Sequence, residues 1–176
     1  TSYSWDFGDG SLQVTTADAS RTYTASGTYD VVMSVTSSNQ CTSSVSNRII
    51  VDPISVAGTA TVANATICEG ANTNLNLTGY TGAIQWQSST DGINFTNITG
   101  ATSATYTTAN LTATTYYQAL VTSGTCSAVT SGVVTVTVSP IPAVTLSSVA
   151  NVYTNATSFD LIYNNAVGTP DEYSIN

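Results

Sequence analysis

The chain has 176 residues, of which about a third are Ser or Thr, and it carries ten acidic residues, two arginines, no lysine and no histidine, for a formal net charge of −8. Without histidine it lacks the usual imidazole base and the commonest metal ligand, and without a Lys/Arg footprint it cannot bind nucleic acid or anionic lipid through phosphates. No apolar run is long enough to cross a bilayer, so we expect no catalytic residue, no cofactor or metal site, no nucleic-acid partner and no direct membrane insertion.

The local pattern predicts strands and turns along the whole chain. Thr, Val and Tyr favour strands, whereas Gly, Asn and Asp favour turns. Residues 29–35 alternate loosely, as a strand inside a sandwich does, and residues 133–138 alternate clearly, as a strand with one buried face does. Asp9-Gly10 and Asp91-Gly92 are hairpin signals. No window shows a sustained helical period, so we expect an all-β chain without helices.

A repeat emerges when two stretches of the chain are compared. The first contains Trp5, Asp9-Gly10, Thr22-Tyr23-Thr24, Thr28-Tyr29 and Cys41, and the second contains Trp86, Asp91-Gly92, Thr105-Tyr106-Thr107, Thr115-Tyr116 and Cys126. The landmarks keep the same order at a separation of about 85 residues, which is the size of one β-sandwich unit.

The end of the chain continues this period. Residues 173–175 echo residues 3–5, and Val152-Tyr153 echoes Ile67-Cys68. Prolines near residues 53 and 140 predict short, stiff linkers. We therefore expect three β-sandwich units: 1–53 without its N-terminal strands, 54–139 complete, and 140–176 as the truncated start of a third. We expect the chain to be a fragment of a longer tandem-repeat protein.

The aromatic landmarks are predicted core residues. Trp5 and Trp86 stand where the central strand of an immunoglobulin-like sandwich has its core Trp, and Tyr29 and Tyr116 stand where such folds have a tyrosine corner. The alternative is an exposed ring that stacks on a sugar. The recurrence of each residue at the same place in the repeat favours the core.

The cysteines predict one disulfide. Cys68 and Cys126 are the only cysteines of the complete unit, so we expect them to pair, while Cys41 occupies the place of Cys126 and its partner would precede Thr1. A disulfide implies an oxidising compartment. A metal site is the alternative use of the cysteines, but the chain offers no histidine and no close Cys pair.

The acidic residues offer little for catalysis. Asp6 and Asp9 are the closest candidates for a carboxylate pair, but in a turn such residues cap backbone amides. Their carboxylates together with turn carbonyls could instead hold a calcium ion. We expect that the chain is not an enzyme.

Two family resemblances follow from these motifs. The run Tyr3-Ser4-Trp5-Asp6-Phe7-Gly8-Asp9-Gly10, followed by Tyr23, Gly27, Tyr29 and Val31, resembles the signature of a PKD (polycystic kidney disease) domain. Residues 54–139 resemble the Ig-like repeats that accompany PKD domains in large surface proteins of gliding Bacteroidetes. This resemblance rests on Cys68-Glu69-Gly70, Trp86 with residues 88–92, residues 98–102 and residues 114–117. The resemblance implies tandem immunoglobulin-like/PKD β-sandwich repeats.

The resemblance also implies a function. It indicates a structural and adhesive segment of a long secreted cell-surface adhesin, of the gliding-motility type and exported by type IX secretion, that serves in surface attachment or gliding. The implied location is the extracellular cell surface, and the implied partners are a surface polysaccharide or other substratum and the secretion and anchoring machinery. The alternative is an accessory or carbohydrate-binding spacer module of a secreted hydrolase.

Overall fold

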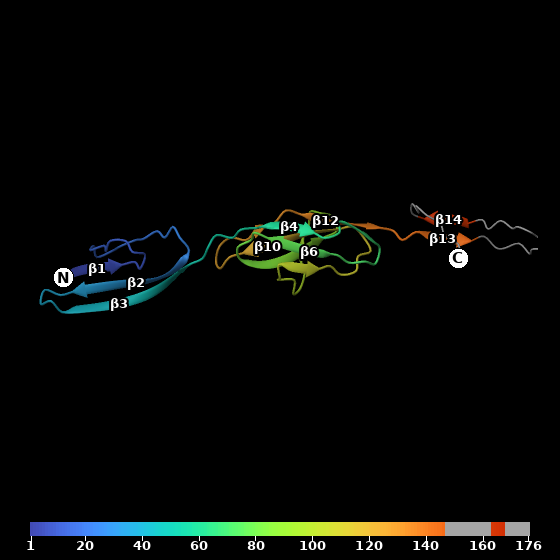
Figure 1. The fold of residues 1–176 in the computed structure, drawn as a ribbon. Helices are drawn as coiled ribbons and strands as arrows, with labels where there is room; N and C mark the ends of the chain where they lie inside the picture. Colours follow the sequence, from blue (N-terminus) through green and yellow to red (C-terminus); the bar gives the residue numbers. More distant parts are fainter. Residues whose placement is uncertain (147–162, 168–176) are drawn as a thin grey trace, which may run out of the picture.

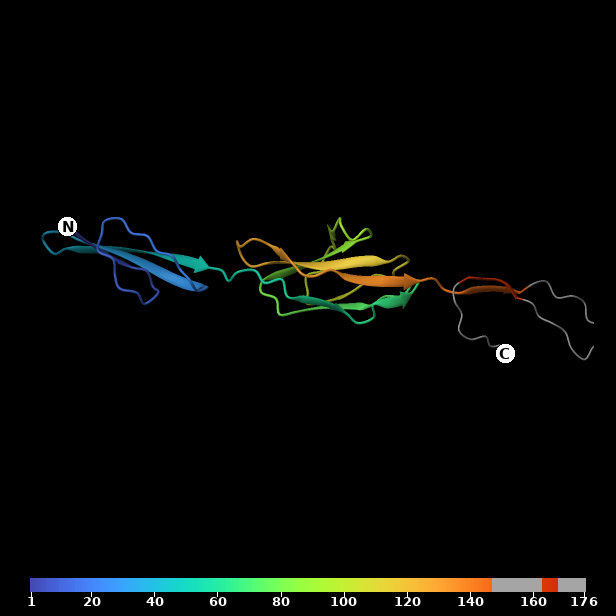
Figure 2. The ribbon, with the colours of Figure 1, turned by 90° about the horizontal axis from the view of Figure 1, so that it is seen from above.

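The computed structural model describes residues 1–146 and 163–167, and every regular element in them is a β-strand. The fold class is all-β, as predicted. Figures 1 and 2 show an N-terminal sheet, a central sandwich and a C-terminal strand pair that follow one another end to end. Within the described ranges there is no helix long and apolar enough to cross a membrane.

The N-terminal sheet has three antiparallel strands in the order β1 (Ser2–Asp6), β2 (Gly27–Thr36) and β3 (Thr42–Val51). Trp5 pairs with Met33 on one side, and on the other side an antiparallel bridge from Trp5 to Val14 brings the following loop back along the edge of β1. Among the described residues no second sheet packs on this one, so Trp5 is only half-buried rather than the core residue that the repeat predicts.

The central sandwich consists of two sheets. The first has the order β4-β6-β9, and the second has the order β5-β12-β10-β7-β8 with β11 beside β10. The strands are β4 (Thr59–Val62), β5 (Thr66–Cys68), β6 (Asn74–Thr78), β7 (Ala83–Ser89), β8 (Thr96–Asn97), β9 (Thr105–Thr107), β10 (Thr115–Thr122), β11 (Val129–Thr130) and β12 (Val134–Ser139).

Strict alternation along the strands builds the core between these sheets. Leu75 and Leu77 of β6 face inward, as do Trp86 of β7, Val121 of β10 and Val136 of β12, and all five are almost fully buried. The outward residues between them are mostly Thr, Gln and Asn. Since each strand has one apolar face, the two sheets bury those faces against each other.

The C-terminal strand pair consists of β13 (Ala143–Leu146) and β14 (Tyr163–Val167), which are antiparallel with an irregularity in register between Ala143 and Thr145. The remaining residues of the predicted third unit, including Val152, Tyr153 and 173–175, lie outside the described residues.

The predicted disulfide between Cys68 and Cys126 is wrong, because the structure holds both as free thiols. Cys68 ends β5 beside Ser139, at the end of the sandwich where β12 leaves it. Cys126 follows β10 at the opposite end, near the entry of the chain at Pro53. The eight residues of β10 between these ends span about 26 Å, whereas a disulfide needs Cα atoms within about 7 Å of each other.

Candidate functional site

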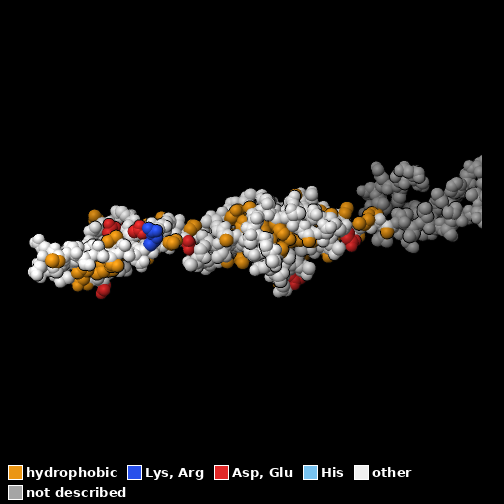
Figure 3. Space-filling model, turned by 90° about the horizontal axis from the view of Figure 1, so that it is seen from below, with side chains coloured by type: hydrophobic (Ala, Val, Ile, Leu, Met, Phe, Trp, Pro, Cys, Tyr) orange, Lys and Arg blue, Asp and Glu red, His pale blue; other side chains and the backbone are white. Residues whose placement is uncertain are grey.

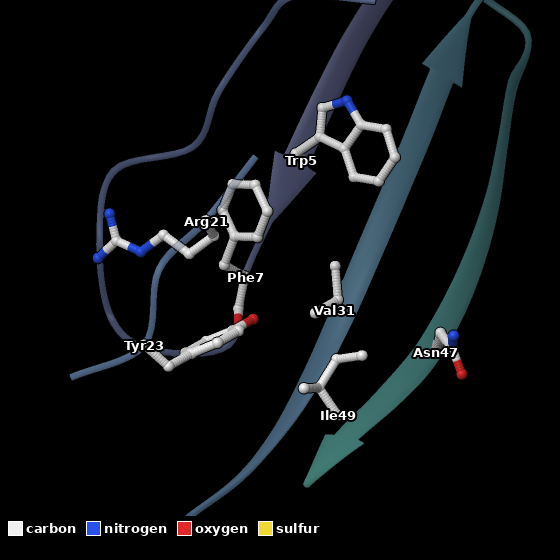
Figure 4. Close-up of a pocket in the computed structure, with 7 residues that line it drawn as sticks. All are labelled: Trp5, Phe7, Arg21, Tyr23, Val31, Asn47 and Ile49. Carbon is white, nitrogen blue, oxygen red and sulfur yellow. The ribbon is translucent and has the colours of Figure 1, made fainter. Parts of the chain in front are cut away.

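A candidate binding hollow lies on the N-terminal sheet. It has a volume of about 260 Å³, and its lining residues are Trp5, Phe7, Arg21, Tyr23, Val31, Asn47 and Ile49. Figure 4 shows the rings of Trp5 and Phe7 over the sheet, with Val31 and Ile49 beneath them and the guanidinium of Arg21 directed away from the rings. The hollow is therefore an apolar, aromatic face rather than a polar cleft.

The aromatic rings of this face stack in two pairs. The centroids of Trp5 and Phe7 are 6.3 Å apart, and those of Tyr23 and Tyr29 are 4.1 Å apart. The Trp5 indole donates to Thr16 O at 3.2 Å. In the central sandwich the corresponding face is covered by the β4-β6-β9 sheet. The aromatic face of the N-terminal sheet therefore corresponds in position to the core face of the central sandwich, and exposed aromatic rings of this kind can also stack on a sugar.

The tyrosine corner is present in the N-terminal sheet. The Tyr29 hydroxyl donates to Ala25 O at 2.9 Å, four residues upstream, and the Tyr23 hydroxyl donates to Phe7 O at 2.9 Å. The Tyr29 bond fastens the end of the long loop between β1 and β2 to β2, and the Tyr23 bond ties that end of the loop to its first residue, just after β1.

Replacing Tyr29 with Phe removes the corner hydrogen bond and keeps the stacked ring. We expect the free energy of unfolding of the N-terminal sheet to fall by about 0.5–1.5 kcal/mol, the usual net contribution of one hydrogen bond. Urea denaturation followed by tryptophan fluorescence measures this loss as a shift of the transition of the N-terminal sheet relative to that of the central sandwich. No loss in Tyr29→Phe, with a loss only in Tyr29→Ala, would show that the stacked ring and not the hydroxyl stabilises the corner.

The prediction of Tyr116 as a core residue is wrong by one position. Tyr117 is the buried ring, with 3% exposure, and Tyr116 lies on the outer face of β10 against Gly92. Tyr117 shares the inward face with Ala119 and Val121. Burial raises the pKa of Tyr117 to about 12, with the nearby Tyr106 contributing in the same direction.

The loop after β1 uses its carboxylates to hold its own backbone. Asp6 accepts from Gly8 N at 2.9 Å, and Asp9 accepts from Ser11 N at 3.1 Å and forms an ion pair with Arg21. Hydrogen bonding from Ser11, followed by that from Arg21, lowers the pKa of Asp9 despite partial desolvation. A guanidinium on Asp9 opposes a bound calcium ion, and no group of three metal-ligating side chains occurs among residues the structure describes.

The turn between β7 and β8 is organised by a single carboxylate. Asp91 accepts from Ile93 N and Asn94 N, both at 2.8 Å, and from Ser89 Oγ and Asn94 Nδ2, both at 2.7 Å. The bond from Asn94 N is the largest of the effects that hold the pKa of Asp91 well below its ordinary value of 3.8. This turn is the hairpin that Asp91-Gly92 predicts.

The stability of the chain should therefore depend on Asp91 in acid. Because the folded pKa is depressed, the contribution of Asp91 is complete above pH 3.8 and is lost as the pH falls below it toward the folded value. The urea concentration at the midpoint of unfolding should therefore be highest at neutral pH, lower at about pH 3 and lower again at about pH 2. In Asp91→Asn the neutral midpoint should be lower and the decline shallower. An identical decline in both proteins would assign the effect to other carboxylates.

The connection between the N-terminal sheet and the central sandwich is held by side-chain contacts. We call residues 52–55 the linker and residues 123–128 the β10–β11 turn. Three hydrogen bonds join them: Thr125 N to Asp52 Oδ2 at 3.1 Å, Ser123 N to Ser55 Oγ at 2.9 Å, and Cys126 Sγ to Pro53 O at 3.5 Å. Just beyond, Val56 and Thr81 exchange two backbone bonds of 3.1 and 3.0 Å. The linker is therefore docked on the central sandwich along its length.

The surface carries few charges. In the face shown in Figure 3, arginine appears in one small area near acidic side chains on the N-terminal sheet. Backbone and side chains that are neither charged nor hydrophobic cover most of the central sandwich, with hydrophobic side chains scattered between them. On its outer face Gln118 donates to Gln87 at 2.8 Å, and Gln87 donates to Asn97 at 2.8 Å. A neutral amide ladder of this kind offers hydrogen bonds but no acid–base chemistry.

Comparison with known proteins gives two family matches. Residues 1–51 match the model of the PKD domain, and residues 56–140 match the model described as "Domain of unknown function (DUF8696)". No curated protein matches the chain in sequence. Among solved structures, that of murine CEACAM1b is similar at 15% identity with a TM-score of 0.49, over 80% of this chain and 85% of that chain. Residues 1–51 are thus similar to a PKD domain, and residues 56–140 are similar to the DUF8696 domain.

Proposed function

We propose that the chain is a structural and adhesive stalk segment of a secreted cell-surface protein. PKD domains are typical of extracellular, multidomain proteins. The low charge, the polar outer faces and the succession of small β-units suit a segment that spaces other parts of a protein. In this proposal the parent is a surface adhesin of the gliding-motility type exported by type IX secretion, and it contacts a polysaccharide or other substratum.

The docked linker is the observation that carries this proposal. A flexible linker of four residues would let two units fold back on each other, whereas the three hydrogen bonds between linker and turn fix the exit direction of β3. Pro53 further restricts the backbone at this place. Units joined in this way transmit their orientation to the next unit, which is the requirement for a stalk.

The proposal excludes catalysis by this segment. Asp6, Asp9 and Asp91 each bind backbone amides of their own turns, so their carboxylates do not face a common cleft. Hydrolysis by carboxylates alone needs two such groups across a substrate, at a separation of about 5–10 Å.

The carbohydrate-binding module is the alternative, and the aromatic face favours it. Trp86 is fully buried and cannot stack on a sugar. A sugar would therefore have to bind at Trp5, Phe7 and Tyr23, where the hollow has room for about one ring. The match of this face to the covered face of the central sandwich supports the stalk instead.

Small-angle X-ray scattering of the purified chain tests the stalk. A compact domain of this length has a radius of gyration of about 16 Å, and we expect a value well above it. A value close to that of a compact domain would overturn the proposal. Isothermal titration with soluble polysaccharides tests the alternative on the same sample: binding that is lost in Trp5→Ala would favour the carbohydrate module.

A further inference from the structure

The N-terminal sheet ends in a long strand whose outer edge has no partner in the described part of the chain. β3 has ten residues, and it pairs with β2 along one side only. In the central sandwich the strands at the sheet edges, β4, β5, β8 and β9, have only two to four residues each. Short edge strands limit pairing with other chains. Among the described strands, β3 therefore offers the longest free edge.

β3 also lacks the features by which edge strands usually avoid pairing. Residues 42–51 contain no proline, no glycine and no lysine, and they pair with β2 without a bulge. Their only charge is that of Arg48, whose Nε donates to Asp30 on β2 at 2.8 Å. Prolines, bulges and unpaired charges are what normally keep an edge strand from recruiting another strand. The backbone of β3 is therefore open to a further strand along its whole length.

The central sandwich uses the equivalent edge for strand pairing. β3 and β12 are equivalent strands, because each pairs with the strand that pairs with the Trp-bearing strand. β12 pairs with β10 on one side and with β5 on the other, where Ile67 lies beside Val138. A strand at this position is thus compatible with the fold.

The sequence of β3 is complementary to itself about Asn47. In an antiparallel pair with the β3 of a second copy, centred on this residue, Val45 faces Ile49 of the second copy and Ile49 faces its Val45. Opposed pairs of β-branched side chains stabilise antiparallel strands. At the centre the two Asn47 amides face each other, and each amide carries both a donor and an acceptor.

Moving the centre by one residue in either direction loses these pairs. Centred on Arg48, the strands would place two guanidinium groups opposite each other, and like charges in directly opposed positions are destabilising. Centred on Ser46, they would place Ile49 opposite Ser43, an apolar side chain against a polar one. The side chains of β3 therefore select one register, with a second copy of β3 as the partner.

The same register continues the aromatic face from one copy to the next. Trp5, Met33 and Val45 form one cross-strand row of the N-terminal sheet, and Ile49 of the second copy extends this row. Asn47 lies on β3 at the outer side of the face (Figure 4). Val45 is 65% exposed and Ile49 is 37% exposed, so both side chains have apolar surface left to bury.

We propose that two copies of this chain associate through their β3 edges, in an antiparallel pair centred on Asn47. A twofold axis relates the copies, and their N-terminal sheets become one continuous sheet. The assembly closes at two copies, because the opposite edge of each sheet is bridged: Trp5 and Val14 exchange backbone bonds of 2.8 and 3.1 Å. This inference goes beyond the stalk function and does not rest on it.

Sedimentation equilibrium of the whole chain over a range of concentrations tests this proposal, with a thiol reductant present so that no disulfide links the copies. We expect a reversible equilibrium between monomer and dimer. Val45→Asp and Ile49→Lys should each weaken the dimer by about tenfold or more, because each removes two apolar pairs and leaves a charge opposite an alkyl side chain. Leu12→Asp is the matched control: Leu12 is 93% exposed in the loop between β1 and β2, and its replacement should leave the dissociation constant unchanged.

Mixing the two weakened variants tests the register. In a dimer of one Val45→Asp chain with one Ile49→Lys chain, the new carboxylate at position 45 faces the new ammonium group at position 49. The other pair, Ile49 with Val45, stays apolar. We expect the mixture to form this mixed dimer more tightly than either variant dimerises alone, as measured by sedimentation with one of the two proteins fluorescently labelled.

Four outcomes would overturn the proposal, provided that circular dichroism shows each variant to be folded. The first is a native chain that stays monomeric at every concentration reached, and the second is one that forms open-ended polymers. The third is a dimer that Val45→Asp does not weaken, which would place the contact on another surface. The fourth is a mixture that associates no better than its components, which would exclude the register centred on Asn47.

Discussion

Replacing Trp86 with Ala is expected to lower the free energy of unfolding of the central sandwich by about 3–5 kcal/mol, the usual cost of truncating a buried aromatic side chain. Trp86 is fully buried among Leu75, Leu77 and Val121, so its removal leaves a cavity between the two sheets. Its indole also donates to Ser103 O at 2.9 Å, and this carbonyl loses its partner. Urea denaturation of the whole chain, followed by far-ultraviolet circular dichroism, measures the loss.

Trp5→Ala is the matched control for this prediction. The residue type and the place in the repeat are the same, but Trp5 is half-buried and its bond to Thr16 O is longer, at 3.2 Å. We expect a smaller loss, confined to the transition of the N-terminal sheet. Equal losses at the two positions would contradict the conclusion that only the central unit of the two has a closed core.

The strands and the core of the central unit could be predicted because their signal is local. Alternation fixes which face of β6, β10 and β12 is apolar, and Asp-Gly fixes the turn between β7 and β8. The loop between β1 and β2 gives no such signal, since side-chain bonds from Tyr23 and Arg21 hold it in place.

The choice between Tyr116 and Tyr117 could not be made from spacing. Two adjacent tyrosines on one strand point to opposite faces, and a shift of one residue in the register exchanges them. The pairing of Ala119 with Trp86 sets the register of β10, and residues 117, 119 and 121 then face the core. The spacing of landmark residues places a strand to within a few residues, whereas a shift of a single residue moves a side chain to the opposite face of the sheet.

The cysteine pairing failed for a topological reason. Cys68 comes early in its unit, which suggests a place near the entry of the chain. β5 runs parallel to β12, however, so both strands end at the exit of the sandwich and carry Cys68 there. Cysteine counting contains no information about strand direction, and the parallel pairing between distant segments is not visible in a local pattern.

Replacing Gly124 with Ala is expected to free the linker and to let the two units reorient independently. Gly124 has φ +50°, and a Cβ placed on it would overlap the carboxylate of Asp52. Real Cβ atoms do not approach that closely, so Asp52 must leave, and its bond from Thr125 N is lost. The left-handed backbone adds about 1–2 kcal/mol of strain for a residue with a Cβ.

Residual dipolar couplings measure this change, because units held in one orientation share one alignment tensor and independent units need two. We expect one tensor to fit the N-terminal sheet and the central sandwich of the native chain, and two to be needed for Gly124→Ala. Gly100→Ala is the matched control: its φ is +76°, but a Cβ there meets nothing within 4 Å. It carries the same kind of backbone strain away from the linker and should keep a single tensor. If Gly124→Ala also keeps one tensor, the contact between Asp52 and the β10–β11 turn does not hold the units, and the orientation must come from Pro53 and the bridge between Val56 and Thr81 instead.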